Sequence, residues 1–264
     1  MKLLDIFPLG NSWLADATCF VAGVECEIED VKAHPKEALA LQLFKADKDG
    51  SLRGKADKDC GYEYISKPMP GPQLIEAFAL LHQDLKFLEN GDPFSHRTST
   101  HVHVNCQSLE TGHIISIMKL YALFEEFFFM MVKSNRRDNI HCVPLTETPL
   151  PAMYGSTLEK LVVNWHKYTA FNMKPLRELG TIEFRHLHGT GDVQEFTQWL
   201  GVLERLWVLG QEVKISKNAL GQPNVILGWF DQIFSPVPMI MKFRPCVHEI
   251  IGNNLIDIKL SMVI

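Results

Sequence analysis

The sequence feature that most constrains the fold is a short segment, Val24 to Glu29, that alternates strictly between apolar and acidic residues. A period of two is typical of a β-strand with two unlike faces, so Glu25, Glu27 and Glu29 would share one face. Neighbouring carboxylates at that spacing lie roughly 7 Å apart. At an effective dielectric constant near ~20, each such pair repels by about 2 kcal/mol. Taken alone, the motif is also compatible with a solvated strand face, where water and salt screen the repulsion.

A second alternating segment, Thr100 to Cys106, carries potential metal ligands on one face. His101, His103 and Asn105 fall on that face, and apolar residues fall on the other. Imidazole is a common metal ligand, although an exposed or hydrogen-bonded pair of histidines would give the same pattern. This segment therefore favours a metal site only in combination with others.

Two further predicted strands supply that combination. Glu183 and Arg185 share one face of the strand 181–187, and Glu63 lies between two tyrosines in the strand 62–66. No lysine occurs on these polar faces, although lysine is common on a solvated sheet. We interpret the four strands as one concave wall that binds metal and anion. Carboxylates with few histidines suit Mg²⁺ or Mn²⁺, which usually bridge to nucleotide phosphates, and Arg185 would contact a phosphate.

The remaining pattern predicts a single domain of mixed helices and strands. A polar loop with a turn at Asp49-Gly50 is expected over 45–60, and a second loop over 143–155. Apolar spacing predicts helices over 73–89, 113–133, about 157–166 and 192–213, with a further strand near 168–173. The pattern is weaker over 214–264, which we treat as an extension of unknown role within one domain, 1–264.

Composition excludes several classes of function. The net charge is −5 and no Lys/Arg cluster is present, so nucleic acid is not expected as the main partner. The apolar stretch 114–132 contains charged residues that are costly in a bilayer, so we expect a core helix there and no membrane partner. Scattered cysteines and the absence of a signal-peptide pattern favour a cytoplasmic protein. No P-loop, G-x-G-x-x-G, G-x-S-x-G or H-E-x-x-H motif occurs.

Seven short motifs occur in an order that resembles the amidoligases of the carboxylate-amine ligase group, which are related to glutamate-cysteine ligase and glutamine synthetase. The resemblance covers residues 21 to about 210. Its motifs are GVECEIE (23–29), DGSL (49–52), GYEYISKPMPG (61–71), HVHV (101–104), NRRDN (135–139), YTAFNM (168–173) and GTIEFRHLHGTGD (180–192).

The resemblance implies an α+β, glutamine synthetase-like catalytic domain, with a curved, mainly antiparallel sheet and helices packed on its outer face. It implies an ATP-dependent ligase that forms an amide or peptide bond through an acyl phosphate, with Mg²⁺ or Mn²⁺ as the metal. The metal ligands it implies are Glu25, Glu27, Glu63, His101 and Glu183. The residues it implies for nucleotide and phosphoryl binding are His103, Arg185, Ser66 and one of Arg136 and Arg137.

The sequence leaves other points open. A base is needed to deprotonate the amine, and Glu29 is the candidate on the acidic face. The substrates would be small-molecule or peptide carboxylates and amines, and a homo-oligomer is compatible with the sequence. The alternatives are a two-metal hydrolase of an amide or phosphoester bond, because Glu/His clusters also activate water, and an inactive binding protein on the same fold.

Overall fold

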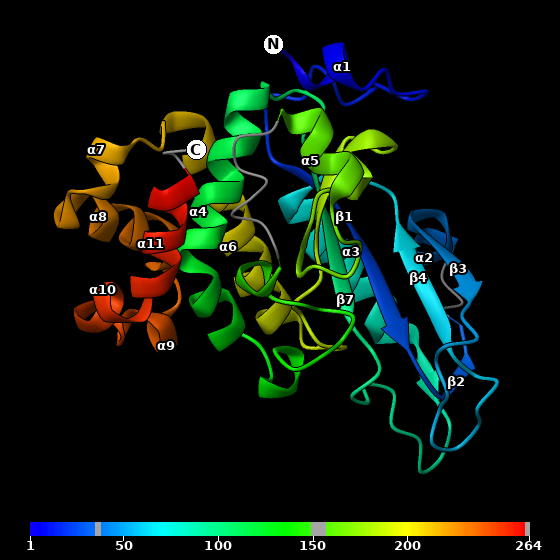
Figure 1. Cartoon of the computed structure of the whole chain (residues 1–264). Coiled ribbons are helices and arrows are strands. Elements are labelled where there is room, and N and C mark those ends of the chain that lie inside the picture. Colours follow the sequence, from blue (N-terminus) through cyan, green and yellow to red (C-terminus); the bar gives the residue numbers. More distant parts are fainter. Residues whose placement is uncertain (35–37, 149–156, 262–264) are drawn as a thin grey trace.

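The computed structural model describes residues 1–34, 38–148 and 157–261, and it is organised around one antiparallel sheet (Figure 1). Six strands of the seven-stranded sheet run in the order β3-β4-β1-β7-β9-β8, and β5 pairs with β1. The strands of this sheet are β1 (Val21–Ile28), β3 (Phe44–Lys48), β4 (Tyr62–Ser66), β5 (Met69–Pro70), β7 (Thr100–Asn105), β8 (Phe171–Asn172) and β9 (Thr181–Phe184). A separate pair is formed by β2 (Val31–Ala33) and β6 (Lys86–Phe87).

The helices lie around this sheet, most of them to the left of it in Figure 1, and the short helix that precedes β3 lies at its right-hand edge. They are α1 (Leu3–Ile6), α2 (Ala38–Leu43), α3 (Gly71–Asp84), α4 (Thr111–Met130), α5 (Leu158–Asn164), α6 (Val193–Glu212), α7 (Lys217–Leu220), α8 (Pro223–Phe234), α9 (Pro238–Met241), α10 (Val247–Ile250) and α11 (Gly252–Ser261). Helix α3 packs against β1, and the long helices α4 and α6 pack against each other. Asp192 begins α6 as an N-cap, accepting hydrogen bonds from the backbone N–H groups of Gln194 and Glu195.

The alternating sequence explains which face of the sheet the helices cover. Val24, Cys26 and Val102, from β1 and β7, are each at most 1% exposed. They belong to one cluster of buried hydrophobic side chains that extends from Leu3 to Ile258. Burying one face against helices leaves the other face for the polar residues. The fold class is α+β with a mainly antiparallel sheet, as the sequence predicts.

The structure corrects two element predictions and shows what the extension forms. Residues 45–48, predicted as part of a loop, belong to β3, because they pair in register with residues 62–65 of β4. The helix predicted over 73–89 ends at Asp84, and β6 follows. In the described part of the extension, 214–261, the chain forms the helices α7 to α11, whose lobe lies beside α4 and α6 on the side away from the sheet (Figure 1).

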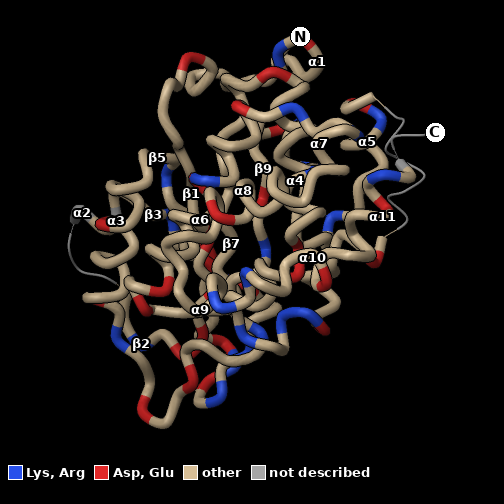
Figure 2. Tube along the Cα trace, turned by 90° about the vertical axis from the view of Figure 1, so that its left-hand side faces the viewer, with Lys and Arg blue, Asp and Glu red and all other residues tan. Residues whose placement is uncertain are grey.

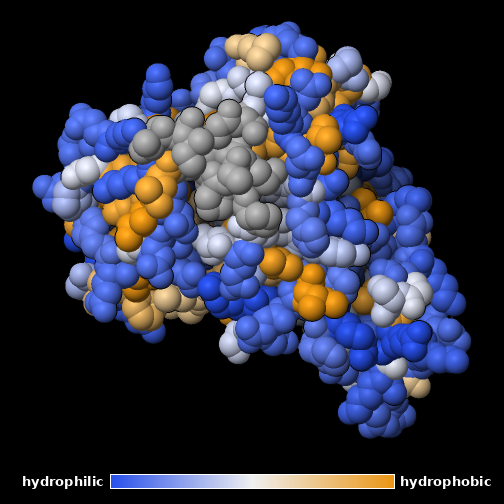
Figure 3. All heavy atoms as spheres, viewed as in Figure 1, coloured by the Kyte–Doolittle hydropathy of each residue, from blue (hydrophilic) through white to orange (hydrophobic). Residues whose placement is uncertain are grey.

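Lys and Arg are interspersed with Asp and Glu along the trace (Figure 2), and hydrophilic residues dominate the face seen in Figure 3, with apolar patches between them. Within the described part of the chain, no helix is both long enough and apolar enough to cross a membrane.

Close packing of α4 and α6 depends on Gly210. A Cβ atom built there would lie 2.2 Å from Ile117 Cγ1 and 3.1 Å from the Ile117 backbone nitrogen. We expect Gly210→Ala to lower the free energy of unfolding by about 1–3 kcal/mol, because the helices must move apart. Urea denaturation would measure the change.

Gly201 in the same helix is the matched control, because a Cβ there meets nothing within 4 Å. We expect Gly201→Ala to be neutral or to stabilise by up to about 1 kcal/mol, since alanine favours a helix over glycine. Equal destabilisation by both substitutions would contradict the packing argument.

Candidate metal centre

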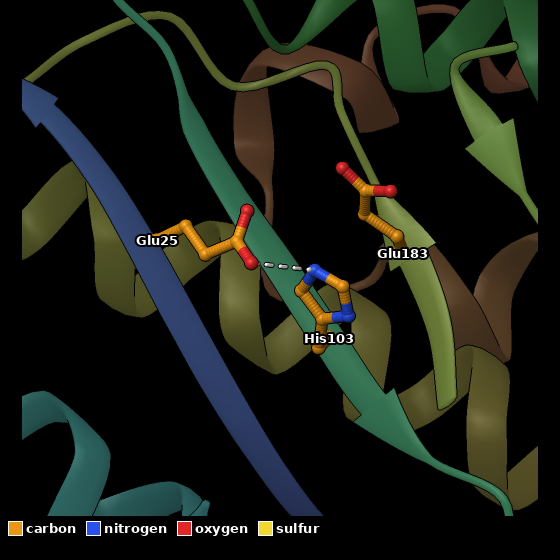
Figure 4. A group of neighbouring side chains, drawn as sticks. All are labelled: Glu25, His103 and Glu183. Atoms are coloured by element: carbon orange, nitrogen blue, oxygen red, sulfur yellow. Dashed lines mark ion pairs between the residues drawn. The ribbon is translucent and has the colours of Figure 1, made fainter. Parts of the chain in front are cut away.

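Three neighbouring strands bring the predicted ligands together on the uncovered face of the sheet. Glu25 on β1 pairs in register with His101 on β7, and His103 pairs with Glu183 on β9. Figure 4 shows Glu25, His103 and Glu183 projecting from these strands on the side away from the helices. One potential ligand atom from each of the three lies within 4.8 Å of the other two. This separation suits ligands that surround a single cation.

Ser99 fixes the tautomer of His101 through a hydrogen-bond chain. The Ser99 hydroxyl makes a short contact with Glu27 Oε2, and it must donate because an ionised carboxylate only accepts. The Ser99 oxygen then accepts from His101 Nε2, 2.7 Å away. His101 Nδ1 is thereby left with a lone pair, 3.5 Å from Glu25 Oε2 and 3.4 Å from Glu183 Oε1. A lone pair directed between two carboxylates is the donor arrangement that a cation requires.

His103 is oriented in a similar way. Its Nδ1 lies 3.1 Å from the Thr181 hydroxyl, and its Nε2 lies 3.2 Å from Glu25 Oε1. The Nε2 atom is buried and has no hydrogen-bond partner among the described residues. When Nδ1–H donates to Thr181, Nε2 is free to coordinate a metal ion.

Glu183 is held by two neighbours. Asn172 Nδ2 on β8 donates to Glu183 Oε2 at 2.7 Å, and Arg185 Nη1 makes a short ion pair with Glu183 Oε1. The Arg185 Nε group also donates to the His141 carbonyl at 3.0 Å. The guanidinium of Arg185 therefore lies at the edge of the metal-ligand group, where the sequence predicts a phosphate contact.

The electrostatics of the face favour a cation. Burial alone would raise the pKa of Glu25, but hydrogen bonds and positive charge from the imidazolium forms of His101 and His103 outweigh it and hold this pKa below its usual range. A bound cation would replace these two protons. Burial, followed by repulsion from Glu25 and Glu27, raises the pKa of Glu63 to about 7. Glu63 is the register partner of both Glu27 and Asp47. A divalent cation bound here would offset the repulsion between these carboxylates.

The donor set fits Mg²⁺ or Mn²⁺. Carboxylate oxygens outnumber imidazole nitrogens, and no cysteine is among the ligands, which disfavours a zinc-type site. The buried Nε2 of His103, which faces Glu25 Oε1 at 3.2 Å, could bind such an ion together with that carboxylate. Glu25, Glu183, His101 and His103 could hold one cation, and Glu27 with Glu63 could extend the site toward β4.

Ser99 provides a test of the hydrogen-bond chain. We expect Ser99→Ala to weaken Mn²⁺ binding by about 10- to 100-fold, because it removes the partner that orients a ligand histidine. Titration calorimetry would measure the affinity. Ser108→Ala is the control, since the Ser108 hydroxyl has no hydrogen-bond partner among the described residues. Unchanged Mn²⁺ affinity in Ser99→Ala would show that the chain does not orient His101.

Three predicted site residues lie outside this group. Glu29 is fully buried one residue beyond β1, where Arg97 Nε and the Arg53 backbone N–H donate to its carboxylate. Because an arginine neutralises it, Glu29 does not have the free carboxylate that a general base needs. Arg136 is 2% exposed and donates to the carbonyls of Arg185 and His186, so it supports the end of β9. The structure therefore places Glu29 and Arg136 apart from the metal-ligand group.

The structure also shows where Arg137 and Ser66 lie. Arg137 lies 3.0 Å from Glu126 and 3.6 Å from Glu147, where its charge is paired away from the sheet. Ser66 accepts from the Val24 backbone N–H at 2.8 Å and donates to the Lys67 carbonyl, and it lines a cavity that also contains Glu25 and His103. Ser66 is thus placed beside the site, and Arg137 is not.

Sequence reasoning missed three supporting residues, Ser99, Asn172 and Thr181. Ser99 and Thr181 follow the same period of two as the ligands, two residues before His101 and Glu183, and this spacing was the available signal. Asn172 contacts Glu183 only because β8 pairs with β9. The alternation of residues in the sequence does not show that β8 pairs with β9.

Comparison with known proteins bears on the family. A family model described as "Putative amidoligase enzyme" matches residues 38–207, which begins after β1. A search of the curated proteins finds no match.

Solved structures give weak likenesses. A crystal structure of a bifunctional glutathione synthetase from Pasteurella multocida is 10% identical with a TM-score of 0.44, covering 93% of this chain and 48% of that one. A crystal structure of a novel glutamine synthase homolog is 11% identical with a TM-score of 0.36, covering 92% and 65%. The chain spans about half of the first of these proteins and less than two thirds of the second. The family match alone, which covers more than half of the 264 residues, makes the assignment, and the chain belongs to this amidoligase family.

Proposed function

We propose that the protein is an ATP-dependent carboxylate-amine ligase that uses Mg²⁺ or Mn²⁺. The observation that carries the proposal is the group formed by Glu25, His103 and Glu183, whose ligand atoms lie within 4.8 Å of one another. His101 Nδ1 lies within 3.5 Å of both carboxylates. Membership of the amidoligase family supports the same reaction class.

The reaction needs an activated acid because oxide is not a leaving group. The carboxylate oxygen of the acid would attack the γ-phosphorus of ATP, releasing ADP and forming an acyl phosphate. The amine nitrogen would then attack the acyl carbon and lose a proton, and inorganic phosphate would leave with the C–O electron pair. The products are an amide, ADP, phosphate and a proton. The acid and the amine are small molecules or peptides in this proposal.

The residues of the chain would supply positioning and charge. Glu25, His101, His103 and Glu183 would hold the cation, whose charge would stabilise the transferring phosphoryl oxygens. Arg185 lies against Glu183 and could turn one N–H group toward a phosphate oxygen. The backbone of β9 that presents both residues is fixed by Arg136. No described residue has been assigned as the base.

Hydroxylamine allows a test without the natural amine. The protein would be incubated with ATP, Mg²⁺, hydroxylamine and pools of carboxylic acids, and ADP and acyl hydroxamate would be measured together. Equal amounts of both products, dependent on acid and metal, would support the ligase. Metal-dependent hydrolysis of amides or phosphoesters without ATP would instead identify a two-metal hydrolase. Absence of metal-dependent ATP binding in calorimetry would also overturn the proposal.

A further inference from the structure

A cavity of about 310 Å³ continues the metal-ligand face toward the beginning of β1. Its lining follows β1 through Val21, Gly23 and Glu25, and it follows β7 through His103. Glu25 and His103 belong both to this cavity and to the proposed metal centre. A molecule in the cavity would therefore have one end at the cation. Ligand cavities in proteins start at about 300 Å³, so the space suits a small organic group.

The chemistry of the lining excludes an anionic occupant. Most of the exposed lining surface is apolar, with contributions from Leu14, Val21 and Ile65. Among the described lining residues, the charged groups other than His103 are Glu25 and Glu178, and none is Lys or Arg. A phosphate or a second carboxylate would meet repulsion and no cationic partner. An uncharged, apolar group would lose little solvation free energy on moving from water into the cavity.

The polar groups of the wall are already used within the protein. Gln107 accepts from the Leu14 backbone N–H at 3.2 Å and donates to the carbonyls of Asn11 and Leu179. Asn105 accepts from the Gln107 backbone N–H at 3.1 Å. These bonds hold residues 11–14 as one side of the cavity. At its rim, Trp13 and Leu179 are 60% and 54% exposed, so two large apolar side chains face solvent beside the opening.

The opposite end of the site differs in charge. Beyond the end of β1, the loop after β3 carries three basic residues, Arg53, Lys55 and Lys58, and three acidic ones, Asp49, Asp57 and Asp59. Its backbone bonds to Glu29 and Asp30. This end also carries the carboxylates Glu27 and Glu63, so it can bind metal ions bridged by phosphates. A polyphosphate suits this end, and an apolar group suits the cavity at the other.

We propose that the cavity holds the apolar body of the acid substrate, whose carboxylate lies at the cation between Glu25, His103 and Glu183, and that this substrate carries no second anionic group. The assignment rests on the proposed ligase function. The acid is favoured over the amine because a cation at Glu25 attracts a carboxylate and repels an ammonium group. The acids selected would be monocarboxylates with an aromatic or aliphatic body.

Gly23 is the position from which a side chain can be built into the cavity. A Cβ atom at this position would lie 3.6 Å from Ser66 Oγ and 3.9 Å from Pro68 Cα, which are ordinary contacts, and the backbone of Gly23 is not in the left-handed region. Gly23→Val therefore places methyl groups in the space and favours the strand. Gly201→Ala on α6 is the control.

The experiment measures binding with Mn²⁺ present, using 3-phenylpropanoate and glutarate as probes. The wild type should bind 3-phenylpropanoate at least tenfold more tightly than glutarate. Gly23→Val should weaken that binding at least tenfold, with Mn²⁺ and MgATP affinities within twofold of the wild type, and Gly201→Ala should change none of them. Thermal unfolding would confirm that both variants are folded.

Several results would overturn the proposal. Equal binding of the two acids, or binding of neither, would contradict the selection of an apolar monocarboxylate. Loss of MgATP binding in Gly23→Val would show that the cavity takes the nucleotide, while leaving the ligase function intact. Failure of the wild type to bind MgATP would instead overturn the ligase function, whatever the acids do, so the two failures are distinguishable.

Discussion

Replacing Glu25 with glutamine is expected to lower the affinity for Mn²⁺ by at least about a hundredfold, the upper end of what the loss of an outer partner of a metal ligand costs. Glu25 approaches both histidines, with Oε2 3.5 Å from His101 Nδ1 and Oε1 3.2 Å from His103 Nε2. Glutamine keeps the shape but removes the charge and one acceptor. If the protein is the proposed ligase, ADP formation should fall by about a thousandfold, on the order of 4 kcal/mol in transition-state stabilisation.

Calorimetry with Mn²⁺ and a coupled assay for ADP would measure the two effects separately. Glu204→Gln removes the same charge from an exposed position on α6 and is the matched control. Glu204→Gln should leave the Mn²⁺ affinity and the rate of ADP formation within twofold of the wild type. Full Mn²⁺ affinity in folded Glu25→Gln would show that Glu25 is not a ligand, and the cation would then have to be held by other carboxylates of the sheet.

The position of the candidate metal ligands on one face of the sheet could be predicted because it depends only on the period of two. Once Val24 and Val102 are buried against the helices, Glu25 and His101 must emerge on the other side. The antiparallel register then aligns His103, on the same face of β7 as His101, with Glu183. Local pattern and global fold agree here, so the sequence alone was sufficient.

Other roles could not be predicted, because they depend on contacts between distant segments. The acidic pattern is continuous from Glu25 to Glu29, but Arg97 reaches Glu29 from the segment before β7 and neutralises it. Glu125 is one of the charged residues within the apolar stretch 114–132. It is fully buried in α4, where it accepts hydrogen bonds from Tyr121 and from the backbone N–H groups of Leu145 and Thr146. The partners of Glu29 and those of Glu125 cannot be deduced from the period of the sequence.

Asp30 is the clearest case of such a long-range contact, and it organises two loops beside the acidic end of the site. Its carboxylate is fully buried and accepts from the backbone N–H groups of Lys55, Ala56, Asp57 and Asp92, at 2.8 to 2.9 Å. Its own backbone is in the left-handed region, with φ of 53°, which is uncommon outside glycine but tolerated by aspartate. One side chain thus joins the loop after β3 to the segment before β7.

Asp30→Asn is expected to lower the free energy of unfolding at pH 7 by about 3–5 kcal/mol, as when one partner of a buried charge is removed. An amide offers one oxygen in place of two and turns its N–H₂ group toward backbone donors. Asp59→Asn, at an exposed position in the same loop, should stay within about 0.5 kcal/mol of the wild type. Urea denaturation would measure both.

The dependence of stability on pH gives a second, independent test of this prediction. Burial alone would raise the pKa of Asp30, but the four backbone donors outweigh it and lower the pKa in the folded protein. A lowered pKa contributes stability that is fully present above the unfolded value of about 3.9 and is lost as the pH falls through the folded pKa. The difference between wild type and Asp30→Asn should therefore be largest near neutrality and shrink below about pH 4. A difference that stays constant from pH 7 to pH 3 would mean that the ionised carboxylate is not what holds the two loops together.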